Sequence, residues 1–557
     1  MKTVKRALAL LLALTMLLAM GAVTVLAANT YTITISGSKV VSGHTYQAYQ
    51  IFAGDLAEKD NKTILSNIKW GNGVDGEALL AALKADTTFG SDFSACTTAA
   101  EVAEKLATYE NDAEKTQQFA KLAGANLTAT VAGTSQWDET NKKYTISGLD
   151  AGYYLVKDAT VPTDDAYTRY ILEVVHDVTV NPKTDVPTVD KKIKENNTTT
   201  TVNEASIGDT IDYVVTSRVP DMTGYNKYYF VLNDTMSKGL TFNVNSVEVT
   251  IGNTKLGTDA YTVTPTTNDD GTTTVKIVLN NFIQYKGQKD AVITVTYSAT
   301  LNENAEVGKN PNVNEVKLTY SNNPNYNYTG ENEPGKDEPT GETPESKVET
   351  YTTELTITKT DSKGNILTGA EFTLTGEGVN IVLVSKTEFT EDANGDYWKL
   401  KNDTYTKTAP TNETKDQYAS ETTKYTKTTT FEAKGTDKTE TTVKGYVDAE
   451  GKITFRGLGA GTYTLTETAT PAGYNTIAPI TFTITFNKDT KTFSSNNEQI
   501  TVDGTTNTFF TTIVNNTGAE LPSTGGVGTT IFYVLGGLLV VCAGVLLITK
   551  RRMNKEA

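Results

Sequence analysis

Hydrophobic and polar residues alternate along much of the chain. The stretches Thr30–Ile35, Ala291–Tyr297, Leu355–Lys359 and Pro479–Phe486 all repeat with a period of two. This period is typical of antiparallel strands that have one buried and one solvated face. Asn-Gly and Asp-Gly turn sequences separate such stretches. The pattern therefore predicts a mostly β chain of tandem immunoglobulin-like β-sandwich domains.

Three segments depart from this alternation. Gly76–Lys84 and Thr97–Leu122 carry Ala, Leu, Glu and Lys at helical spacing, which predicts helices inserted in the first domain. Near the end of the chain, the apolar run Ile531–Ile548 is followed by the basic residues Lys550-Arg551-Arg552. Its length and its positive flank predict a transmembrane helix whose basic tail stays in the cytoplasm.

The beginning of the chain has the order of a targeting segment. Basic residues precede the apolar stretch Ala7–Met20, and small residues follow at Val25-Leu26-Ala27. This order predicts a secretory signal peptide. The stretch Asn322–Glu345, rich in Asn, Pro, Gly and Glu, predicts a loop or linker. The predicted organisation is a signal peptide at 1–28, an N-terminal domain at 29–184, a second domain at 185–346, a third domain at 347–518 and a tail at 519–557.

Charge and cysteine content narrow the classes of function. The 557 residues carry a formal net charge of −16, and the basic residues are dispersed. Nucleic acid is therefore excluded as an expected partner. The chain has two cysteines, Cys96 and Cys542, and Cys542 lies in the apolar tail. A secreted chain without a disulfide needs another means of stabilisation.

No metal, cofactor or enzyme site is expected. The two histidines, His44 and His176, lie outside any metal-binding or catalytic-triad pattern. His44 follows a glycine in a predicted turn, which favours a surface position. The stretch Asp392–Asp396 has calcium-loop character, but the sixth position, which needs glycine, is Tyr397. A secreted enzyme on a β scaffold is therefore the less favoured interpretation.

An internal repeat links the first and third domains. The sequence GLDAGYYLVKDATVP begins at Gly148, and GLGAGTYTLTETATP begins at Gly457. Without gaps, Asp158 aligns with Glu467. Both domains are therefore expected to contain a late strand that ends near an acidic residue.

Three polar residues of the third domain share the phase of hydrophobic neighbours. Lys359 is in phase with Leu355 and Ile357, Glu467 with Leu465, and Asn515 with Ile513. The three polar side chains are therefore expected to point inward. Burial without mutual contacts is costly, so we expect them to meet.

Burial also changes what these groups do chemically. Desolvation lowers the pKa of a lysine and raises the pKa of a carboxylic acid, so both tend to their neutral forms. A neutral amine is a nucleophile, and a protonated carboxyl polarises an amide carbonyl and moves protons. The hypothesis is an amide between Lys359 and Asn515, formed with loss of ammonia.

The strand that carries Glu467 belongs to a longer motif, YxLxETxxPxGY, formed by Tyr463, Leu465, Glu467, Thr468, Pro471, Gly473 and Tyr474. This motif is similar to the E-box of the pilins of Gram-positive bacteria, so the third domain resembles that family. The resemblance implies a CnaB-type module in which Lys359 and Asn515 are isopeptide partners and Glu467 is the catalytic acid. Asn516 is the alternative partner.

The second domain resembles the CnaA-type domain of the same pilins. Lys191 is in phase with Val189 and Ile193, and Asn314 precedes the strand sequence EVKLTY. The resemblance implies that Lys191 and Asn314 are bond partners and that Asp234 is the promoting acid. Lys192 and Asn312 are the alternatives. In the first domain Gly37 takes the place of the lysine, which predicts no bond there.

The tail and one junction residue complete the resemblance. The pentapeptide Leu521-Pro522-Ser523-Thr524-Gly525 stands before the apolar run and is an LPXTG sorting motif. Lys183, after Pro182 at the first junction, partly matches the pilin motif of the family. The resemblance implies that a class C sortase cleaves after Thr524 and joins Thr524 to Lys183 of the next subunit.

The resemblance spans almost the whole chain and implies the backbone subunit of a sortase-assembled pilus or fimbria. The expected location is the cell wall and the surface pilus, after transient residence in the plasma membrane. The expected partners are further copies of the chain, class C and housekeeping sortases, accessory pilins, peptidoglycan and host surface ligands. The alternative is a wall-anchored adhesin that does not polymerise and does not use Lys183.

Overall fold

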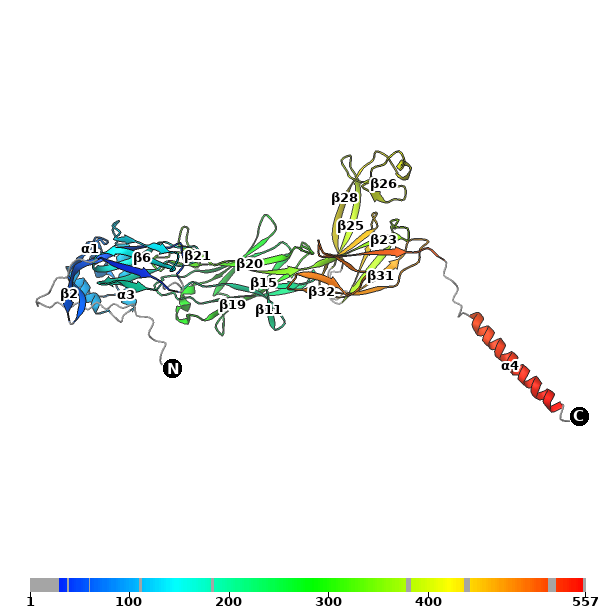
Figure 1. The fold of residues 1–557 in the computed structure, drawn as a ribbon, viewed down its shortest axis with the longest axis horizontal. Helices are drawn as coiled ribbons and strands as arrows, with labels where there is room; N and C mark the ends of the chain where they lie inside the picture. Colours follow the sequence, from blue (N-terminus) through cyan, green and yellow to red (C-terminus); the bar gives the residue numbers. More distant parts are fainter. Residues whose placement is uncertain are drawn as a thin grey trace.

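The fold is that of a computed structural model, which describes residues 30–37, 40–59, 61–109, 113–181, 185–376, 382–434, 441–518 and 527–553. Three pairs of β-sheets follow one another along an elongated rod, and a helix lies beyond its C-terminal end (Figure 1). The prediction of a mostly β chain is confirmed. The predicted signal peptide, Lys183 and the pentapeptide Leu521–Gly525 lie outside the described residues.

The first unit holds strands β1 to β9. One sheet has the order β5-β6-β1-β9, and the other has the order β3-β2-β7-β8 with β4 beside β2. Strand β1 runs antiparallel to β6 and parallel to β9. The strands are β1 Tyr31–Ile35, β2 Thr45–Lys59, β3 Lys62–Trp70, β4 Gly133–Thr134, β5 Gln136–Asp138, β6 Lys143–Leu149, β7 Gly152–Thr160, β8 Arg169–Val174 and β9 Val178–Val180.

Helices α1 (Gly76–Ala85), α2 (Ala99–Ala107) and α3 (Ala113–Ala125) lie between β3 and β4, as the helical spacing predicted. Their apolar residues form one core with those of β2 and β7. A capping box of Thr98 and Glu101 begins α2. The stretch 97–122, expected to be helical, contains α2 and the greater part of α3. Helix α2 ends where the Thr108 backbone N–H donates to the Lys105 carbonyl, 3.0 Å away.

The second unit holds strands β10 to β22. A six-stranded sheet has the order β11-β10-β13-β19-β15-β16, and a seven-stranded sheet has the order β12-β22-β20-β14-β18-β17 with β21 beside β20. The strands are β10 Asp190–Glu195, β11 Thr198–Thr200, β12 Val202–Glu204, β13 Thr210–Arg218, β14 Phe230–Met236, β15 Leu240–Ile251, β16 Thr254–Lys255, β17 Tyr261–Thr267, β18 Thr273–Leu279, β19 Val292–Leu301, β20 Asn312–Ser321, β21 Thr340–Glu342 and β22 Ser346–Tyr351, with the 3-10 helix η1 Phe282–Gln288.

The predicted loop Asn322–Glu345 is mostly irregular but packs closely on the second unit. Tyr328 is buried, and the Asn226 side chain donates to its carbonyl at 2.8 Å and accepts from its N–H at 3.0 Å. The Tyr229 hydroxyl donates to the Glu338 carboxylate at 2.8 Å. The segment is therefore an ordered part of the second unit and not a flexible linker.

The third unit holds strands β23 to β35. A six-stranded sheet has the order β28-β25-β30-β23-β35-β34, and a five-stranded sheet has the order β29-β24-β31-β32-β33. The strands are β23 Thr353–Asp361, β24 Glu371–Gly376, β25 Val382–Glu391, β26 Trp398–Lys399, β27 Tyr405–Thr406, β28 Tyr425–Lys434, β29 Thr442–Tyr446, β30 Lys452–Leu458, β31 Gly461–Ala469, β32 Ile480–Asn487, β33 Thr492–Ser495, β34 Thr501–Asp503 and β35 Thr508–Asn515, with the 3-10 helix η2 Lys415–Gln417.

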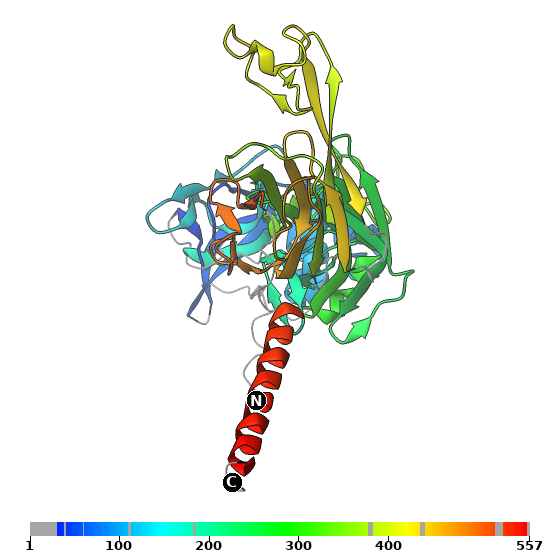
Figure 2. The ribbon, with the colours of Figure 1, turned by 90° about the vertical axis from the view of Figure 1, so that its right-hand side faces the viewer.

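A long hairpin leaves the third unit at an angle to the rod. Strands β25 and β28 pair along their whole length. Strand β25 pairs with β30 at Leu383 and Val384, and the Ser385 hydroxyl accepts from the Thr454 N–H at 2.8 Å. Beyond that point the two strands extend away from the sheets and carry a small lobe with β26 and β27 (Figures 1 and 2). Phe389 stacks on Tyr405 with ring centroids 3.9 Å apart, which holds the lobe against the hairpin.

Hydrogen bonds connect successive units. At the first junction the Tyr167 backbone N–H donates to the Asn322 carbonyl at 2.7 Å. At the second junction the Ile207 N–H donates to the Gly457 carbonyl at 3.0 Å. Strand β22 pairs with β12 and β20 of the second unit, although the predicted boundary at 346 placed it in the third domain. The first strand of the third unit is β23, which begins after Thr352. The alternation of β22 continues into β23 with one residue between them, so the sequence pattern does not mark this change.

Helix α4 (Val527–Met553) fits the predicted transmembrane segment. Its stretch Ile531–Arg551 has a mean hydropathy of 2.7 and is long enough to cross a membrane. Its apolar side chains do not pack on the sheets of the rod. The helix therefore has the composition of a membrane anchor.

Candidate intramolecular cross-link sites

Lys191, Asp234 and Asn314 meet in the core of the second unit. Lys191 lies on β10 of the six-stranded sheet, whereas Asp234 on β14 and Asn314 on β20 belong to the facing seven-stranded sheet. At most 1% of each residue is exposed. The strand alternation that points apolar neighbours into the core therefore directs these three polar side chains there as well.

The contacts among the three side chains are close. The Lys191 Nζ is in hydrogen-bond contact with both the Asp234 Oδ2 and the Asn314 Oδ1. The rings of Tyr213 and Tyr297 flank the same Nζ, with centroids 5.4 and 5.3 Å away. The amine thus lies between an acid and an amide, in a space that aromatic rings close to water.

Burial moves the amine and the acid toward their neutral forms. It lowers the pKa of Lys191 to about 8, against the opposing effect of the Asp234 charge. It also raises the pKa of Asp234. The Lys191 ammonium therefore gives its proton to Asp234 more readily than an exposed lysine would, and the neutral amine that results is a nucleophile.

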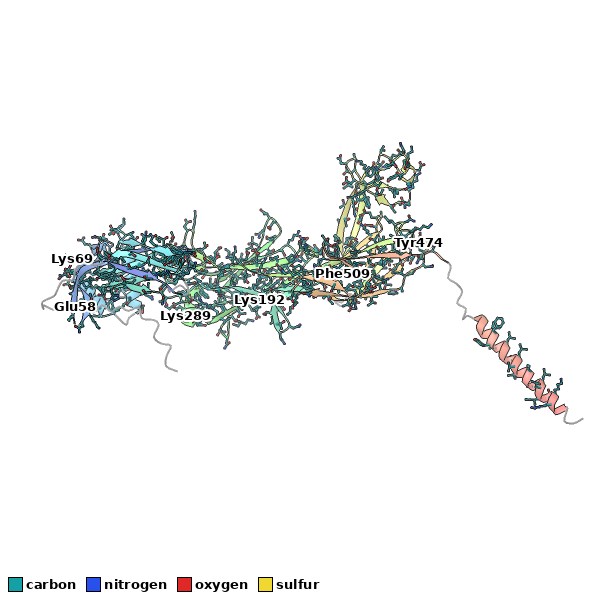
Figure 3. All side chains as sticks on the ribbon, viewed as in Figure 1. Glu58, Lys69, Lys192, Lys289, Tyr474 and Phe509 are labelled. Carbon is teal, nitrogen blue, oxygen red and sulfur yellow. The ribbon has the colours of Figure 1, made fainter. Side chains whose placement is uncertain are left out.

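The two alternatives weighed for this site lie elsewhere. Lys192 is half-exposed and pairs with Asp190 at 3.1 Å (its position on the second unit is marked in Figure 3). Asn312 is buried, but its amide donates to the Glu306 and Thr350 carbonyls. The structure therefore brings Lys191 and Asn314 together, and places Lys192 and Asn312 outside the cluster.

Lys359, Glu467 and Asn515 form a second cluster in the third unit. Strand β23 with Lys359 pairs in parallel with β35, which ends at Asn515. Glu467 comes from β31 of the facing sheet. Lys359 and Asn515 are fully buried, and Glu467 is 3% exposed. The first strand and the last strand of the unit are thus neighbours, with the acid across from both.

In this cluster the acid contacts both of the other groups. The Lys359 Nζ is 3.8 Å from the Glu467 Oε1, and the Asn515 Nδ2 donates to the Glu467 Oε2 at 2.9 Å. The Asn515 Nδ2 also donates to the Asn475 carbonyl at 2.6 Å. Burial lowers the pKa of Lys359. Asn516, the alternative partner, is exposed next to the cluster.

Two oxygens of the third-unit cluster are buried without a hydrogen-bond partner among the described residues, the Glu467 Oε1 and the Asn515 Oδ1. The Asp234 Oδ1 of the second unit is in the same condition. Unpaired buried oxygens are uncommon in folded proteins, and each needs an explanation. In the second unit the amine contacts both the acid and the amide, whereas in the third unit the acid contacts both the amine and the amide.

The first unit has a different cluster at the position of the aligned acid. Asp158 on β7 is buried and faces His44, with 3.1 Å between the His44 Nδ1 and the Asp158 Oδ1. The His44 Nε2 lies 3.2 Å from the Asp165 Oδ2. These two carboxylates raise the pKa of His44 to about 9 although burial opposes the shift. His44 is therefore held as a cation between two acids.

The expectation that His44 lies on the surface was wrong. It is 7% exposed, and its ring stacks on Tyr46 with centroids 5.4 Å apart. The turn before it ends at Gly43, and His44 already shares the phase of the buried residues Tyr46 and Ala48. This phase could have predicted that His44 is buried, but Gly43 next to it indicated a turn.

The sequence repeat corresponds to a repeated structural motif. In both copies a glycine with positive φ, Gly148 at 78° and Gly457 at 90°, stands near the end of a strand. In both copies a tyrosine hydroxyl donates to the carbonyl four residues earlier at 2.9 Å: Tyr154 to Asp150, and Tyr463 to Gly459. The aligned acids Asp158 and Glu467 thus follow the same turn.

Other candidate sites are not supported by clusters of ligands. Among the residues that the structure describes, no group of three or more His, Cys, Asp or Glu side chains is placed to hold a metal ion. The stretch Asp392–Asp396 forms a turn in which the Asp392 side chain accepts from the Asn394 N–H at 2.9 Å. Cys96 is buried as a free thiol.

Comparison with protein families identifies three regions. Residues 207–324 match a model described as Gram-positive pilin backbone subunit 2, Cna-B-like domain. Residues 416–499 match a prealbumin-like fold domain, and residues 513–555 match the LPXTG cell wall anchor motif. We expected a CnaA-type domain in the second region, whereas the matching model is described as Cna-B-like.

Comparison with individual proteins gives the same class. The chain is 27% identical, over 417 residues, to the trypsin-resistant surface T6 protein of Streptococcus pyogenes serotype M6, covering 66% of this chain and 70% of that protein. It resembles the solved T6 backbone pilin with a TM-score of 0.51 at 16% identity, over 89% of this chain and all of that one. The major pilin SpaD of Corynebacterium diphtheriae is similar with a TM-score of 0.45 at 17% identity, over 88% of this chain and 98% of that one.

Proposed function

We propose that this chain, a homologue of the backbone pilins of Gram-positive bacteria, is joined head to tail through Thr524 of one copy and Lys183 of the next. It is a structural subunit of a pilus and carries an LPXTG cell wall anchor. Such a subunit is polymerised by sortase and anchored to the wall. The residues that form the joint are the part that we propose.

The joint forms in two balanced steps. A class C sortase breaks the peptide bond between Thr524 and Gly525 and keeps the Thr524 acyl group as a thioester on its cysteine. The neutral Nζ of Lys183 then attacks the thioester carbon, which forms an amide and releases the thiol. At the base of the fibre, a housekeeping sortase transfers the last thioester to peptidoglycan.

Each of the two buried clusters forms an internal amide. The acid, Asp234 or Glu467, takes a proton from the lysine Nζ. The amine then attacks the asparagine Cγ, and the new C–N bond forms. The proton held by the acid passes to Nδ2, the old C–Nδ2 bond breaks with release of ammonia, and the acid takes the second Nζ proton, which leaves a neutral amide. The bonds join Lys191 to Asn314 and Lys359 to Asn515.

The two buried clusters, each in a separate unit of the rod, are the observation that carries the proposal. Strands β23 and β35 are the first and last strands of the third unit and lie side by side. An amide between them sends tension from one terminal strand directly to the other, so the sandwich does not need to unfold under load. A covalent polymer exposed to shear needs this property, whereas a catalyst does not.

Accessory pilins and host surface ligands belong to the same proposal as partners of the assembled fibre. A non-polymerising surface adhesin would share the anchor and both clusters but not the joint at Lys183. The two functions therefore differ in a single chemical observation, the use of the Lys183 amine.

Substitution of Lys183 by alanine tests the proposal. Wall extracts of the native host carrying Lys183→Ala should lose the ladder of high-mass polymers and keep wall-attached monomer, because the anchor motif is intact. Lys194→Ala, at an exposed lysine of β10, is the matched control and should keep the ladder. A ladder that persists in Lys183→Ala sinks the backbone function in favour of the adhesin or of another acceptor.

A further inference from the structure

A tyrosine hydroxyl completes the second-unit cluster. Tyr297 lies on β19 and is 3% exposed. Its hydroxyl donates to the Asp234 Oδ2 at 2.5 Å and accepts from the Asn314 Nδ2 at 3.3 Å. Neither the sequence pattern nor the family resemblance pointed to this residue. It touches the acid on one side and the nitrogen that must leave as ammonia on the other.

These contacts close a ring of hydrogen bonds. The Lys191 Nζ contacts the Asp234 Oδ2 and the Asn314 Oδ1, and the tyrosine hydroxyl connects the same Oδ2 to the Asn314 Nδ2. Every atom that changes its proton or its bond in amide formation is therefore a member of one ring. Asp234 itself makes no hydrogen bond to the Asn314 Nδ2 among the described contacts.

The third unit differs at this point. There the acid is a glutamate, one methylene longer, and it contacts the leaving nitrogen directly, with 2.9 Å between the Glu467 Oε2 and the Asn515 Nδ2. The second position around that nitrogen is taken by the Asn475 carbonyl, which cannot supply a proton. In the second unit the shorter Asp234 thus reaches the leaving nitrogen through the Tyr297 hydroxyl, whereas in the third unit the longer Glu467 reaches it directly.

We propose that Tyr297 is a catalytic proton relay between Asp234 and the leaving nitrogen of Asn314, an inference that rests on the proposed amide formation. The Asp234 carboxylate takes a proton from the Lys191 ammonium, and the amine adds to the Asn314 Cγ. Addition makes Nδ2 a basic amine, so the hydrogen bond to it reverses. Tyr297 gives its proton to Nδ2 and takes the proton held by Asp234. The C–Nδ2 bond breaks, and ammonia leaves with its third hydrogen. The Asp234 carboxylate, free again and in contact with Nζ, takes the second Nζ proton, which leaves a neutral amide.

The surroundings of the hydroxyl suit exchange of protons without a lasting charge. Burial and the Asp234 charge raise the pKa of Tyr297 well above its ordinary value, so it stays a neutral phenol. A group of this kind receives one proton as it gives another. It therefore transfers the proton in a concerted manner and does not serve as a base that is ionised beforehand.

Tyr320 provides a matched control for the relay. It is fully buried in the core of the same unit and lies on β20, the strand that also carries Asn314, six residues further along the chain. The Tyr320 hydroxyl is buried without a hydrogen-bond partner among the described residues. Tyr320→Phe therefore removes a buried hydroxyl from the same unit and leaves the proton path intact.

The test follows cross-linking of the full-length chain in time. The chain is translated in a cell-free system, samples are quenched in denaturant, and the peptide that joins Lys191 to Asn314 is quantified by mass spectrometry. We expect Tyr297→Phe to slow this bond by roughly 100-fold or more, the size typical of a lost proton-transfer group. The Lys359–Asn515 bond in the same molecule should form at its usual rate and serves as an internal control for folding. Tyr320→Phe should leave both rates within about two-fold.

Two further measurements separate a relay from packing. Wild-type cross-linking in D2O should show a solvent isotope effect that Tyr297→Phe alters, whereas a packing role predicts the same effect in both chains. In the double variant Asp234→Glu with Tyr297→Phe, the longer acid should reach Nδ2 and recover part of the rate even if Tyr297→Phe alone folds poorly. Unchanged kinetics in Tyr297→Phe, or equal slowing by Tyr320→Phe, overturns the relay. Absence of the Lys191–Asn314 bond from the wild-type chain overturns the proposed amide itself.

Discussion

Glu467→Gln is the sharpest test of the third-unit chemistry. Glutamine keeps the shape of the side chain and a hydrogen-bond acceptor for the Asn515 Nδ2, but it does not take a proton from Lys359. The wild-type chain, after any cleavage of the signal peptide, should be lighter than its sequence mass by two ammonia molecules. The Glu467→Gln chain should be lighter by one, and the remaining deficit should map to Lys191 and Asn314.

The expected loss of stability follows from the loop that the bond closes. An amide between Lys359 and Asn515 closes a loop of about 150 residues, for which the chain-entropy relation gives about 5 kcal/mol through restriction of the unfolded state. For a unit of this size, that corresponds to a fall in melting temperature of about 10–20 °C. Glu467→Gln also leaves the Lys359 charge without its buried carboxylate at 3.8 Å, which adds to the loss.

Scanning calorimetry with intact-mass analysis of the same samples separates these contributions. The double variant Lys359→Met with Glu467→Gln removes the buried charge together with the bond. The fall in its melting temperature relative to the wild-type chain therefore reports the loss of the closed loop alone. Glu498→Gln, at an exposed glutamate of the third unit, is the control and should change neither the mass deficit nor the melting temperature. A full deficit of two ammonia molecules in Glu467→Gln would refute the role given to the acid. A single deficit with an unchanged melting temperature would refute the mechanical and entropic argument.

Two further predictions concern other parts of the rod. His44 has a folded-state pKa of about 9 against 6.5 in the unfolded chain, so its ion pairs stabilise the first unit fully below pH 6.5. This stability, up to about 3 kcal/mol, is lost as the pH rises through 9. Denaturant unfolding of the full chain between these pH values should show a free energy of unfolding that falls with pH, and His44→Gln should abolish that fall. A wild-type free energy of unfolding that does not change with pH would contradict the assignment. Replacing the projecting hairpin Thr387–Thr429 by a short turn should leave both cross-links intact by mass, because β25 pairs with β30 at Leu383 and Val384, before the replaced segment. Loss of the Lys359–Asn515 bond would show that the hairpin supports the core.

The period-two pattern was sufficient to predict strands and the face on which their polar residues lie. Lys359 and Glu467 are buried on the same face of their strands as the hydrophobic residues in phase with them. Alternation is a local property, so it survives in the fold without knowledge of strand pairing. The meeting of β23 with β35 is a long-range pairing that alternation does not show. It was expected from the cost of burying Lys359 and Asn515 without partners and from the family resemblance.

Features that depend on packing between elements were missed. Tyr297 looks like any core tyrosine in the sequence, because its role depends on residues of two strands in the facing sheet. The burial of His44 depends on Asp158 and Asp165, which lie more than a hundred residues later in the chain. The loop Asn322–Glu345 has the composition of a linker, yet Tyr328 and Glu338 anchor it to the second unit. Composition describes such segments as polar and does not show what they pack on.

The central claim is the joint between subunits, and its most direct test is the chemical structure of that joint. Polymers are released from the wall, digested with a protease, and searched by tandem mass spectrometry for branched peptides. The account predicts a peptide in which the Thr524 carbonyl forms an amide with the Nζ of Lys183. A joint at a different lysine, or Thr524 found only on peptidoglycan fragments, would contradict it.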